Sequence, residues 1–214
     1  MIKVIDNFFD KCDDIEKLFR SQEFSWYYVD FTSNYTIEPE SHPEDLPILK
    51  KIQDKNKDLL ITDYLQFSHS FYKFIEGESR SILNTKEKYL DITKDIVEAA
   101  NKKLNENYKQ KNIIRSKANL QTQNSINNTN KLNPPHRDMD FPHYVMLYYV
   151  NDSDGDTFFF DTGGNLLKRV SPKKGRLVYF NGELYHSGSN PVKSGDRMVV
   201  NINLDYDYEQ DYSR

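Results

Sequence analysis

The C-terminal half of the chain is a series of short apolar segments separated by turn-forming residues. Each segment is rich in β-branched and aromatic residues, and Gly, Asp, Asn and Pro stand between them, as turns require. The segments are residues 142–151, 157–160, 165–170, 176–180 and 197–204. Several short strands with no helix between them predict an antiparallel sandwich or barrel, and a jelly roll fits best.

Alternation within residues 197–204 separates a polar face from an apolar one. Met198, Val200, Ile202 and Leu204 project to one side and belong against a core. The opposite side carries Arg197, Val199, Asn201 and Asn203, and therefore lines something polar, with Arg197 at its deep end. Both faces of residues 142–151 are apolar or aromatic, so periodicity does not orient that strand.

The N-terminal half predicts supporting elements around this barrel. Residues 1–9 begin as an alternating strand, and residues 10–22 read as a short amphipathic helix. Residues 86–110 form the strongest helix, because Ile92, Ile96, Ala100 and Leu104 recur at helical spacing with charge opposite. Residues 113–121 resume a strand. An aromatic cluster is interpreted mainly as packing beneath the barrel; it contains Trp26, Tyr27, Tyr28, Phe31 and Tyr35.

Two further segments read as loops. Residues 41–47 are punctuated by proline. Residues 121–135 show no hydrophobic period and precede His136, so they fit either a lid over a site or a disordered insert. The whole pattern predicts one domain over residues 1–214, mainly β with flanking helices (α+β). Residues 1–112 supply an N-terminal strand and supporting helices, and residues 113–204 supply the core barrel.

Composition limits the environment and the partners. A single cysteine excludes an internal disulfide and a Cys-based metal site, and suits a reducing cytoplasm. No apolar run approaches membrane-spanning length, and the N-terminus lacks a secretory signal, so we expect a cytoplasmic protein without membrane contact. A net charge of −4 gives no general attraction to nucleic acid. The basic run Lys168, Arg169, Lys173, Lys174 and Arg176 is interpreted as a solvated edge.

The candidate chemistry lies in His136, Asp138, His186 and Arg197. Two imidazoles and one carboxylate make a three-ligand face for ferrous iron and leave coordination positions open. His186 is expected in a turn that contains Gly182 and Gly188. Arg197 offers a planar fork for a carboxylate. Other titratable side chains have plainer interpretations: His143 at the rim or behind the ligands, His42 and His69 as structural residues, and Asp140 as the less suitably spaced carboxylate.

Residues 135–204 resemble the iron- and 2-oxoglutarate-dependent dioxygenases of the prolyl hydroxylase group, including bacterial and phage members. The matching motifs are His136-Arg137-Asp138, Tyr148-Tyr149-Val150-Asn151, Gly155-Asp156-Thr157, the run from Pro172 to Phe180, His186 and Arg197. Their order is far more specific than any one of them. The resemblance implies a double-stranded β-helix, the cupin-like form of the jelly roll.

The resemblance also implies cofactors and roles. Fe(II), 2-oxoglutarate and dioxygen are expected, with ascorbate as a further candidate. Iron would be held by His136, Asp138 and His186, and the far carboxylate of 2-oxoglutarate by Arg197, assisted by Tyr149 and Asn201. The chain departs from the family where a Tyr is usual on the strand before the iron ligands, and Asn119 or Lys117 takes that place. The family's Trp after Asn151 is also absent, and Arg197 stands where collagen-type enzymes have Lys.

Hydroxylation of an unactivated C–H bond is the expected reaction. The family branch favours a prolyl or other residue of a peptide or protein. Hydroxylation of a free amino acid or small metabolite is the alternative, and a non-catalytic cupin-like binding module is a third reading. Tyr179, Phe180 and Tyr185 are predicted to receive the substrate. Nucleic acid is disfavoured, because Arg197 is not followed by the second Arg of the enzymes that repair alkylated bases. The sequence does not set the oligomeric state.

Overall fold

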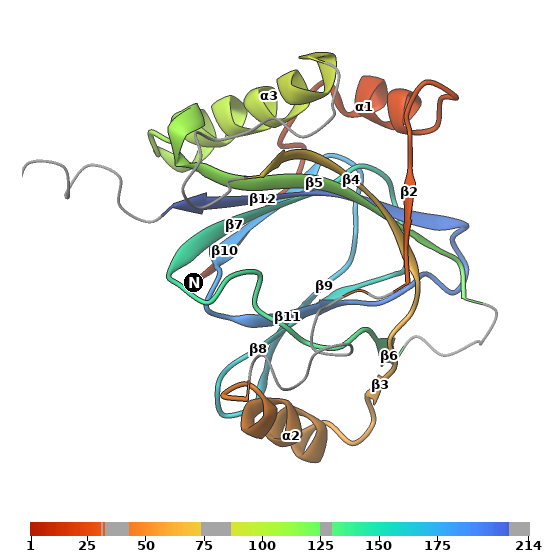
Figure 1. The fold of residues 1–214 in the computed structure, drawn as a ribbon, viewed down its shortest axis with the longest axis vertical. Coiled ribbons are helices and arrows are strands. Elements are labelled where there is room, and N and C mark those ends of the chain that lie inside the picture. The colour runs from red at the N-terminus through yellow and green to blue at the C-terminus, as the bar shows by residue number, and fades with distance from the viewer. Residues whose placement is uncertain (31, 33–42, 74–86, 125–129, 206–214) are drawn as a thin grey trace, which may run out of the picture.

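The computed structural model describes residues 1–30, 32, 43–73, 87–124 and 130–205 (Figure 1). Within them, seven strands form a large sheet in the order β1-β10-β7-β12-β5-β4-β2, antiparallel throughout. The strands are β1 (Ile2–Ile5), β10 (Arg176–Asn181), β7 (His143–Tyr149), β12 (Asp196–Asp205), β5 (Ile113–Thr122), β4 (Gln66–Lys73) and β2 (Tyr27–Val29). The long antiparallel pairs β12–β5 and β12–β7 fix the centre of this sheet.

A smaller sheet packs against one face of the large one. It has the order β11-β8-β9 and consists of β11 (Tyr185–Gly188), β8 (Thr157–Phe160) and β9 (Leu166–Val170). A short parallel pair joins β3 (Leu60–Ile61) to β6 (Lys131–Leu132). Two facing antiparallel sheets confirm the prediction of a mainly β, jelly-roll-like fold.

Helices flank the two sheets on opposite sides (Figure 1). The outer face of the large sheet is covered by α1 (Cys12–Phe19) and α3 (Glu87–Leu104), and α2 (Leu46–Lys55) lies beside β8 on the far side. A 3-10 turn, η3 (Gln110–Asn112), leads into β5. Among the described residues, no helix is long and apolar enough to cross a lipid bilayer.

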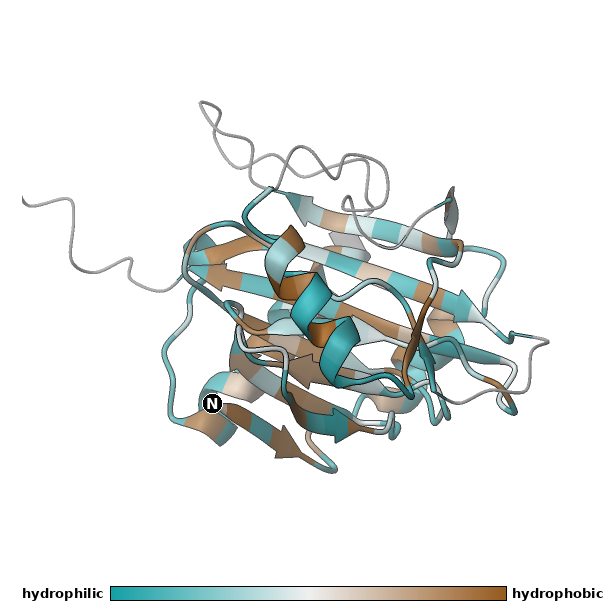
Figure 2. Cartoon of the chain, turned by 90° about the horizontal axis from the view of Figure 1, so that it is seen from below, coloured by the Kyte–Doolittle hydropathy of each residue, from teal (hydrophilic) through white to brown (hydrophobic). Residues whose placement is uncertain are grey.

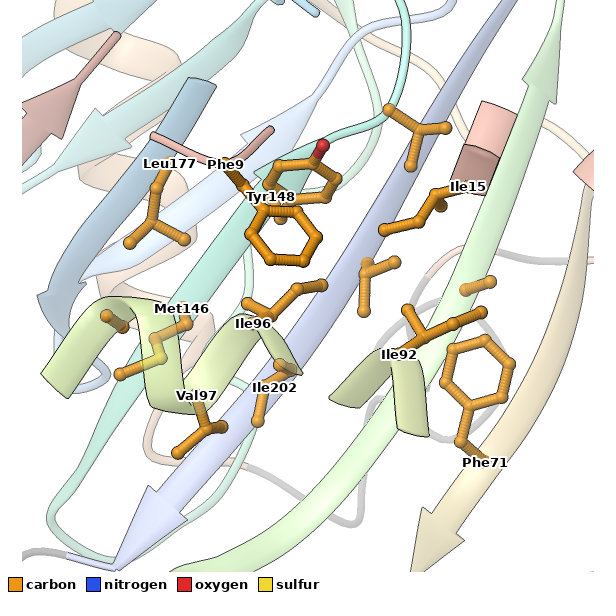
Figure 3. Close-up of a cluster of buried hydrophobic side chains, with 14 of the residues drawn as sticks. Phe9, Ile15, Phe71, Ile92, Ile96, Val97, Met146, Tyr148, Leu177 and Ile202 are labelled. Atoms are coloured by element: carbon orange, nitrogen blue, oxygen red, sulfur yellow. The ribbon is translucent and has the colours of Figure 1, made fainter. Parts of the chain in front are cut away.

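Two apolar clusters divide the side chains of β7 between them. Met146, Tyr148 and Val150 pack under α3, where Figure 3 shows Ile92, Ile96 and Val97 facing Met146 and Ile202. The inner cluster between the sheets contains Val145, Leu147, Tyr149, Phe159, Val170, Val178, Phe180 and Val199. The orientation that periodicity left open is therefore set by two separate cores.

The alternation predicted for β12 is confirmed. Met198, Val200, Ile202 and Leu204 all belong to the cluster beneath α3, so the opposite side of the strand faces the smaller sheet. Bands of hydrophobic and hydrophilic residues alternate along the strands in Figure 2. The polar inner side of β12 is thus enclosed between the sheets.

Several expectations for the N-terminal half need correction. It supplies three strands of the large sheet, β1, β2 and β4, instead of one, so residue 112 marks no boundary in the sheet. The loop expected at 41–47 ends in a helix, because α2 begins at Leu46 with a proline in its first turn. Of the aromatic cluster, Trp26 packs against Phe19 and Phe24 as expected, whereas Tyr27 and Tyr28 are 55% and 62% exposed on an edge strand and lie outside the core. Phe31 and Tyr35 lie outside the described residues.

The predicted loop over residues 121–135 is structured at both ends. Its start belongs to β5, and its end contains β6, where Leu132 is fully buried. Asn133 is buried as well, and its amide donates to the carbonyl of Gly188 at 2.8 Å. Residues 125–129 lie outside the described residues, so the choice between lid and insert stays a prediction.

Candidate metal and 2-oxoglutarate site

His136, Asp138 and His186 meet at the mouth of the space between the sheets. Their ligand atoms lie within 4.8 Å of one another. Nε2 of His136 lies 4.0 Å from one Asp138 carboxylate oxygen, and Nε2 of His186 lies 3.7 Å from the other. The structure therefore brings together the three residues predicted to hold a metal.

The two histidines are joined directly through the backbone. The amide of His136 donates to the carbonyl of His186 at 3.0 Å, and the reverse bond is 2.9 Å. His186 is not in a turn, as predicted, but in β11, where it pairs with Phe159 of β8. His136 precedes β7 and is isolated from any named strand, so this bridge attaches it to the smaller sheet.

Backbone carbonyls set the orientation of both imidazoles. Nδ1 of His136 lies 3.1 Å from the carbonyl of Pro134, and Nδ1 of His186 lies 3.2 Å from that of Leu184. A carbonyl oxygen only accepts, so each Nδ1 carries the hydrogen and each Nε2 keeps its lone pair. Those lone pairs belong to the atoms nearest Asp138, as metal binding requires.

Asp138 is an ionised carboxylate held by three donors. Nη2 of Arg115 donates to Oδ1 at 2.5 Å, and the amides of Asn201 and Asn203 donate to Oδ2 at 3.0 and 2.8 Å. Burial alone would raise the pKa of Asp138, but Arg115 and the neighbouring imidazoles and cations hold that pKa well below its usual range. Burial lowers the pKa of His136, and it lowers the pKa of His186 to about 4. At neutral pH the donor set is two neutral imidazoles and one anion.

Arg197 begins the inner face of β12 and is 4% exposed. Its guanidinium donates to the Gly155 carbonyl, the Gln121 side-chain oxygen and the Thr157 hydroxyl, each at 2.8 Å. All three acceptors are neutral, and burial lowers the pKa of Arg197. Among the described residues, no carboxylate has a hydrogen bond to this guanidinium. A buried cation with only neutral partners is suited to an incoming anion.

Two glycines make room for that guanidinium. A Cβ on Gly155 would lie 2.5 Å from the Ser189 carbonyl and 2.9 Å from Cδ of Arg197. A Cβ on Gly188 would lie 3.2 Å from the guanidinium carbon. Side chains at these positions would displace Arg197, so both glycines shape the anion end of the site.

One cavity connects Arg197 with the three candidate ligands. Its lining includes Lys117, Asn119 and Gln121 of β5, Val199 and Asn201 of β12, Thr157 of β8 and Leu147 of β7. Asn119 is therefore at the site, although its side-chain oxygen is buried without a hydrogen-bond partner. Asn201 donates to Asp138, and its expected help in holding 2-oxoglutarate beside Arg197 stays a prediction.

Tyr149 packs its ring against the Arg197 guanidinium outside the cavity. Its ring centroid lies 5.6 Å from the guanidinium carbon, and its hydroxyl donates to Thr157 at 2.7 Å. Tyr149 is fully buried and outside the cavity lining. Thr157 therefore receives hydrogen bonds from both Tyr149 and Arg197, and it presents that shared oxygen at the cavity wall.

The other histidines that the structure describes, His69 and His143, are not members of the candidate ligand group. His143 is buried at the start of β7, with Nδ1 2.8 Å from the Phe141 carbonyl, and it interacts electrostatically with Asp138 and His186. Of its two expected places, the rim is therefore wrong and the position behind the ligands fits. His69 is buried among aromatic rings, 4.7 Å from that of Phe24, which confirms its structural interpretation. Asp140 is exposed and outside the metal group. His42 lies outside the described residues.

The aromatic residues expected to receive the substrate are buried in apolar clusters and do not line the cavity. Tyr179 and Phe180 are fully buried and Tyr185 is 1% exposed, because alternation on β10 sends Tyr179 and Phe180 into different cores. Phe180 instead packs its ring 5.0 Å from that of His186. The prediction was wrong because it assumed that aromatic residues close to His186 in sequence would be exposed in the site.

A buried aspartate that sequence analysis missed connects both ligand segments. Asp45, at the N-cap of α2, accepts a hydrogen bond from Nη2 of Arg137 at 2.9 Å and another from the Tyr185 hydroxyl. Arg137 stands between two candidate ligands, and Tyr185 precedes the third. The sequence indicates this role of Asp45 only weakly, because an Asp before a Leu-Pro pair suggests no more than the start of a helix.

Comparison with known proteins shows that the chain shares its fold with solved structures. No protein-family model matches the chain, and no curated protein matches its sequence. An oxidoreductase of the 2OG-Fe(II) oxygenase family from Burkholderia pseudomallei has a similar structure, with a TM-score of 0.52 at 13% identity, over 68% of this chain and 69% of the other.

Two further solved structures are similar over most of the chain. A Trichoplax adhaerens prolyl hydroxylase in complex with a hypoxia inducible factor peptide fragment has a TM-score of 0.52 at 14% identity, over 95% of this chain and 83% of the other. HygX from Streptomyces hygroscopicus, with nickel and 2-oxoglutarate bound, has a TM-score of 0.52 at 13% identity, over 97% and 83%. The chain therefore has the fold of the 2OG-Fe(II) oxygenases.

Proposed function

We propose that the chain is an Fe(II)- and 2-oxoglutarate-dependent dioxygenase that hydroxylates an unactivated C–H bond. The observation that carries this proposal is one cavity with a His136/Asp138/His186 group near one end and the Arg197 guanidinium at the other. The same inner face of β12 links the two ends, through Asn201 beside Asp138 and Arg197 four residues earlier.

The residues present fit the expected metal. Two neutral imidazoles and one carboxylate suit ferrous iron and leave other positions for cosubstrate and dioxygen. With iron bound, 2-oxoglutarate and dioxygen would supply the oxidation, giving succinate, carbon dioxide and a hydroxylated product. Arg115, Asn201 and Asn203 keep Asp138 ionised and oriented, and Arg197 holds the far carboxylate of 2-oxoglutarate.

A prolyl or other residue of a peptide is the leading substrate class. The prolyl hydroxylase from Trichoplax adhaerens, bound to a peptide fragment, supports it through the shared fold. Because one fold serves many reactions, this support is an analogy. A free amino acid or small metabolite is the second candidate, and the polar lining of the cavity favours it, since Leu147 and Val199 are its only apolar members among the described residues.

Anaerobic titration with Fe(II) and then 2-oxoglutarate tests the proposal. Wild type should bind one Fe(II), and His186→Ala should lose tight binding because two donors remain. Arg197→Ala should bind iron normally and lose 2-oxoglutarate affinity by about ten-fold or more, the effect of one charged hydrogen-bonded pair. Equal iron stoichiometry in His186→Ala, or unchanged 2-oxoglutarate affinity in Arg197→Ala, would contradict the assignment.

A further inference from the structure

Lys117 is a second cation in the cavity, far from Arg197. It lies on the inner face of β5 and pairs in register with Asn201, whereas Gln121 pairs with Arg197. Because these pairs are four residues apart along the strands, the backbone positions of the two cations are separated by about 13 Å. Asn201 also bonds Asp138, so Lys117 belongs to the metal end of the cavity.

In the described part of the chain, the Lys117 ammonium makes no hydrogen bond and no ion pair. Asp138 attracts this ammonium electrostatically, but the hydrogen bonds of its carboxylate come from Arg115 and two amides. Burial lowers the pKa of Lys117 to about 8, and the charge of Arg115 acts in the same direction. In the metal-free protein the Lys117 ammonium is therefore still mostly protonated at neutral pH.

The charges lining the cavity do not cancel after iron and cosubstrate are added. Lys117 and Arg197 are cations and Asp138 is an anion. Ferrous iron adds two positive charges, and 2-oxoglutarate adds two negative ones. One positive charge remains, and low dielectric makes an unpaired charge costly.

A polar atom beside Lys117 also lacks a partner. The side-chain oxygen of Asn201 is buried with no hydrogen bond, and its orientation is fixed because the Asn201 amide nitrogen donates to Asp138. The Asn119 oxygen is likewise unpaired. A molecule that offered a carboxylate to Lys117 and an N–H to one of these oxygens would satisfy both.

We propose that Lys117 binds a carboxylate of the primary substrate, so that the substrate of this site is an acid carrying a nearby N–H donor. This inference rests on the proposed function. The carboxylate belongs either to a free amino acid or to an acidic side chain or C-terminus of a peptide. Bound in this way, the acid would hold the adjacent carbon close to the metal end of the cavity.

The protein loaded with Ni(II) and 2-oxoglutarate allows binding to be measured without turnover. The probes are the free L-amino acids and short peptides that contain proline or an acidic residue, each paired with its carboxamide. Calorimetric titration gives the Kd of the acid and the Kd of the carboxamide in every pair. The variants are Lys117→Met, Lys117→Arg and, as a matched control, Lys103→Met, which removes an exposed lysine at the end of α3.

At least one acid should bind wild type about ten-fold or more tightly than its carboxamide, as expected for a charged hydrogen bond. Lys117→Met should remove this difference and leave 2-oxoglutarate affinity unchanged, while Lys117→Arg should retain part of it and Lys103→Met all of it. The pairs that bind identify free amino acid or peptide as the source.

Equal binding of acids and carboxamides, or no binding of any acid, would overturn the inference. So would a loss of 2-oxoglutarate affinity in Lys117→Met as large as that in Arg197→Ala, because Lys117 would then serve the cosubstrate. Failure of wild type to bind Ni(II) and 2-oxoglutarate is a different result, since it would remove the proposed function itself.

Discussion

At the residue scale, the cavity is dominated by cations held without matching anions. Arg197 has three neutral acceptors, and Lys117 makes no hydrogen bond or ion pair within the described residues. Asp138 is surrounded by donors, so the metal end is ready to bind a cation through a carboxylate that never protonates near neutral pH. Such arrangements are unfavourable for folding and are typical of sites that await a ligand.

The first prediction concerns the cost of Lys117 to stability. Lys117→Met should stabilise the metal-free protein at pH 7 by about 1 to 3 kcal/mol, because it removes a poorly compensated charge from a buried position. The free energy of unfolding from urea titration measures this change. A destabilised variant would show that Lys117 has a compensating partner.

The difference in unfolding free energy between wild type and Lys117→Met should change with pH in one direction. Burial lowers the pKa of Lys117 to about 8 in the folded protein, from an ordinary value of 10.5. Between these values the unfolded chain binds more protons, so wild-type stability from this group rises with pH. The gap between wild type and Lys117→Met should therefore narrow from pH 8 toward pH 10.5. A constant gap would exclude a depressed pKa.

At the element scale, sequence patterns identified strands well where each face had one environment. β12 separates an apolar face from a polar one, and its alternation predicted both the core and the lining of the site. β7 could not be oriented because cores lie on both sides of it. β11 was missed because it is short and carries His186 and Ser187, which do not read as strand. Asp45 was missed because its partners come from distant segments.

The second prediction tests the connection that Asp45 makes between the ligand segments. Asp45→Asn should weaken metal binding by about ten-fold or more, because Arg137 and Tyr185 lose the charged acceptor that fixes their backbone beside the candidate ligands. Anaerobic Fe(II) titration measures the affinity, and a denaturation curve checks that the variant is folded. Asp54→Asn, at an exposed position of α2, is the control. Equal affinity in both variants would show that the Asp45 carboxylate does not contribute to metal binding.

The third prediction concerns the contact of α2 with the β8–β9 turn. Gly164 has φ of +82°, and a Cβ there would lie 2.5 Å from the backbone carbon of Lys51. Gly164→Ala should therefore destabilise the protein by about 1 to 3 kcal/mol through backbone strain and displacement of α2. Gly195→Ala is the matched control, because a Cβ at Gly195 meets nothing within 4 Å. Similar unfolding free energies for the two variants would contradict the predicted contact.

At the scale of the whole molecule, the site spans both sheets. His186 comes from the smaller sheet, which also holds His136 through the backbone bridge, and Arg197 comes from the large one. Metal and cosubstrate would together connect the sheets across the cavity. Ligands that bind only the folded state stabilise it by about 2.7 kcal/mol at one hundred times Kd.

The fourth prediction follows from this connection. Under anaerobic conditions, saturating Fe(II) should raise the Tm of wild type, and 2-oxoglutarate added to the Fe(II) form should raise it again, each by about 5 to 10 °C for a chain of this size. Arg197→Ala should keep the first rise and lose most of the second. His186→Ala should lose both, because 2-oxoglutarate without metal is held only at its far carboxylate. Differential scanning calorimetry measures each step, and a full 2-oxoglutarate shift in Arg197→Ala would show that the two ends of the cavity do not act on one molecule.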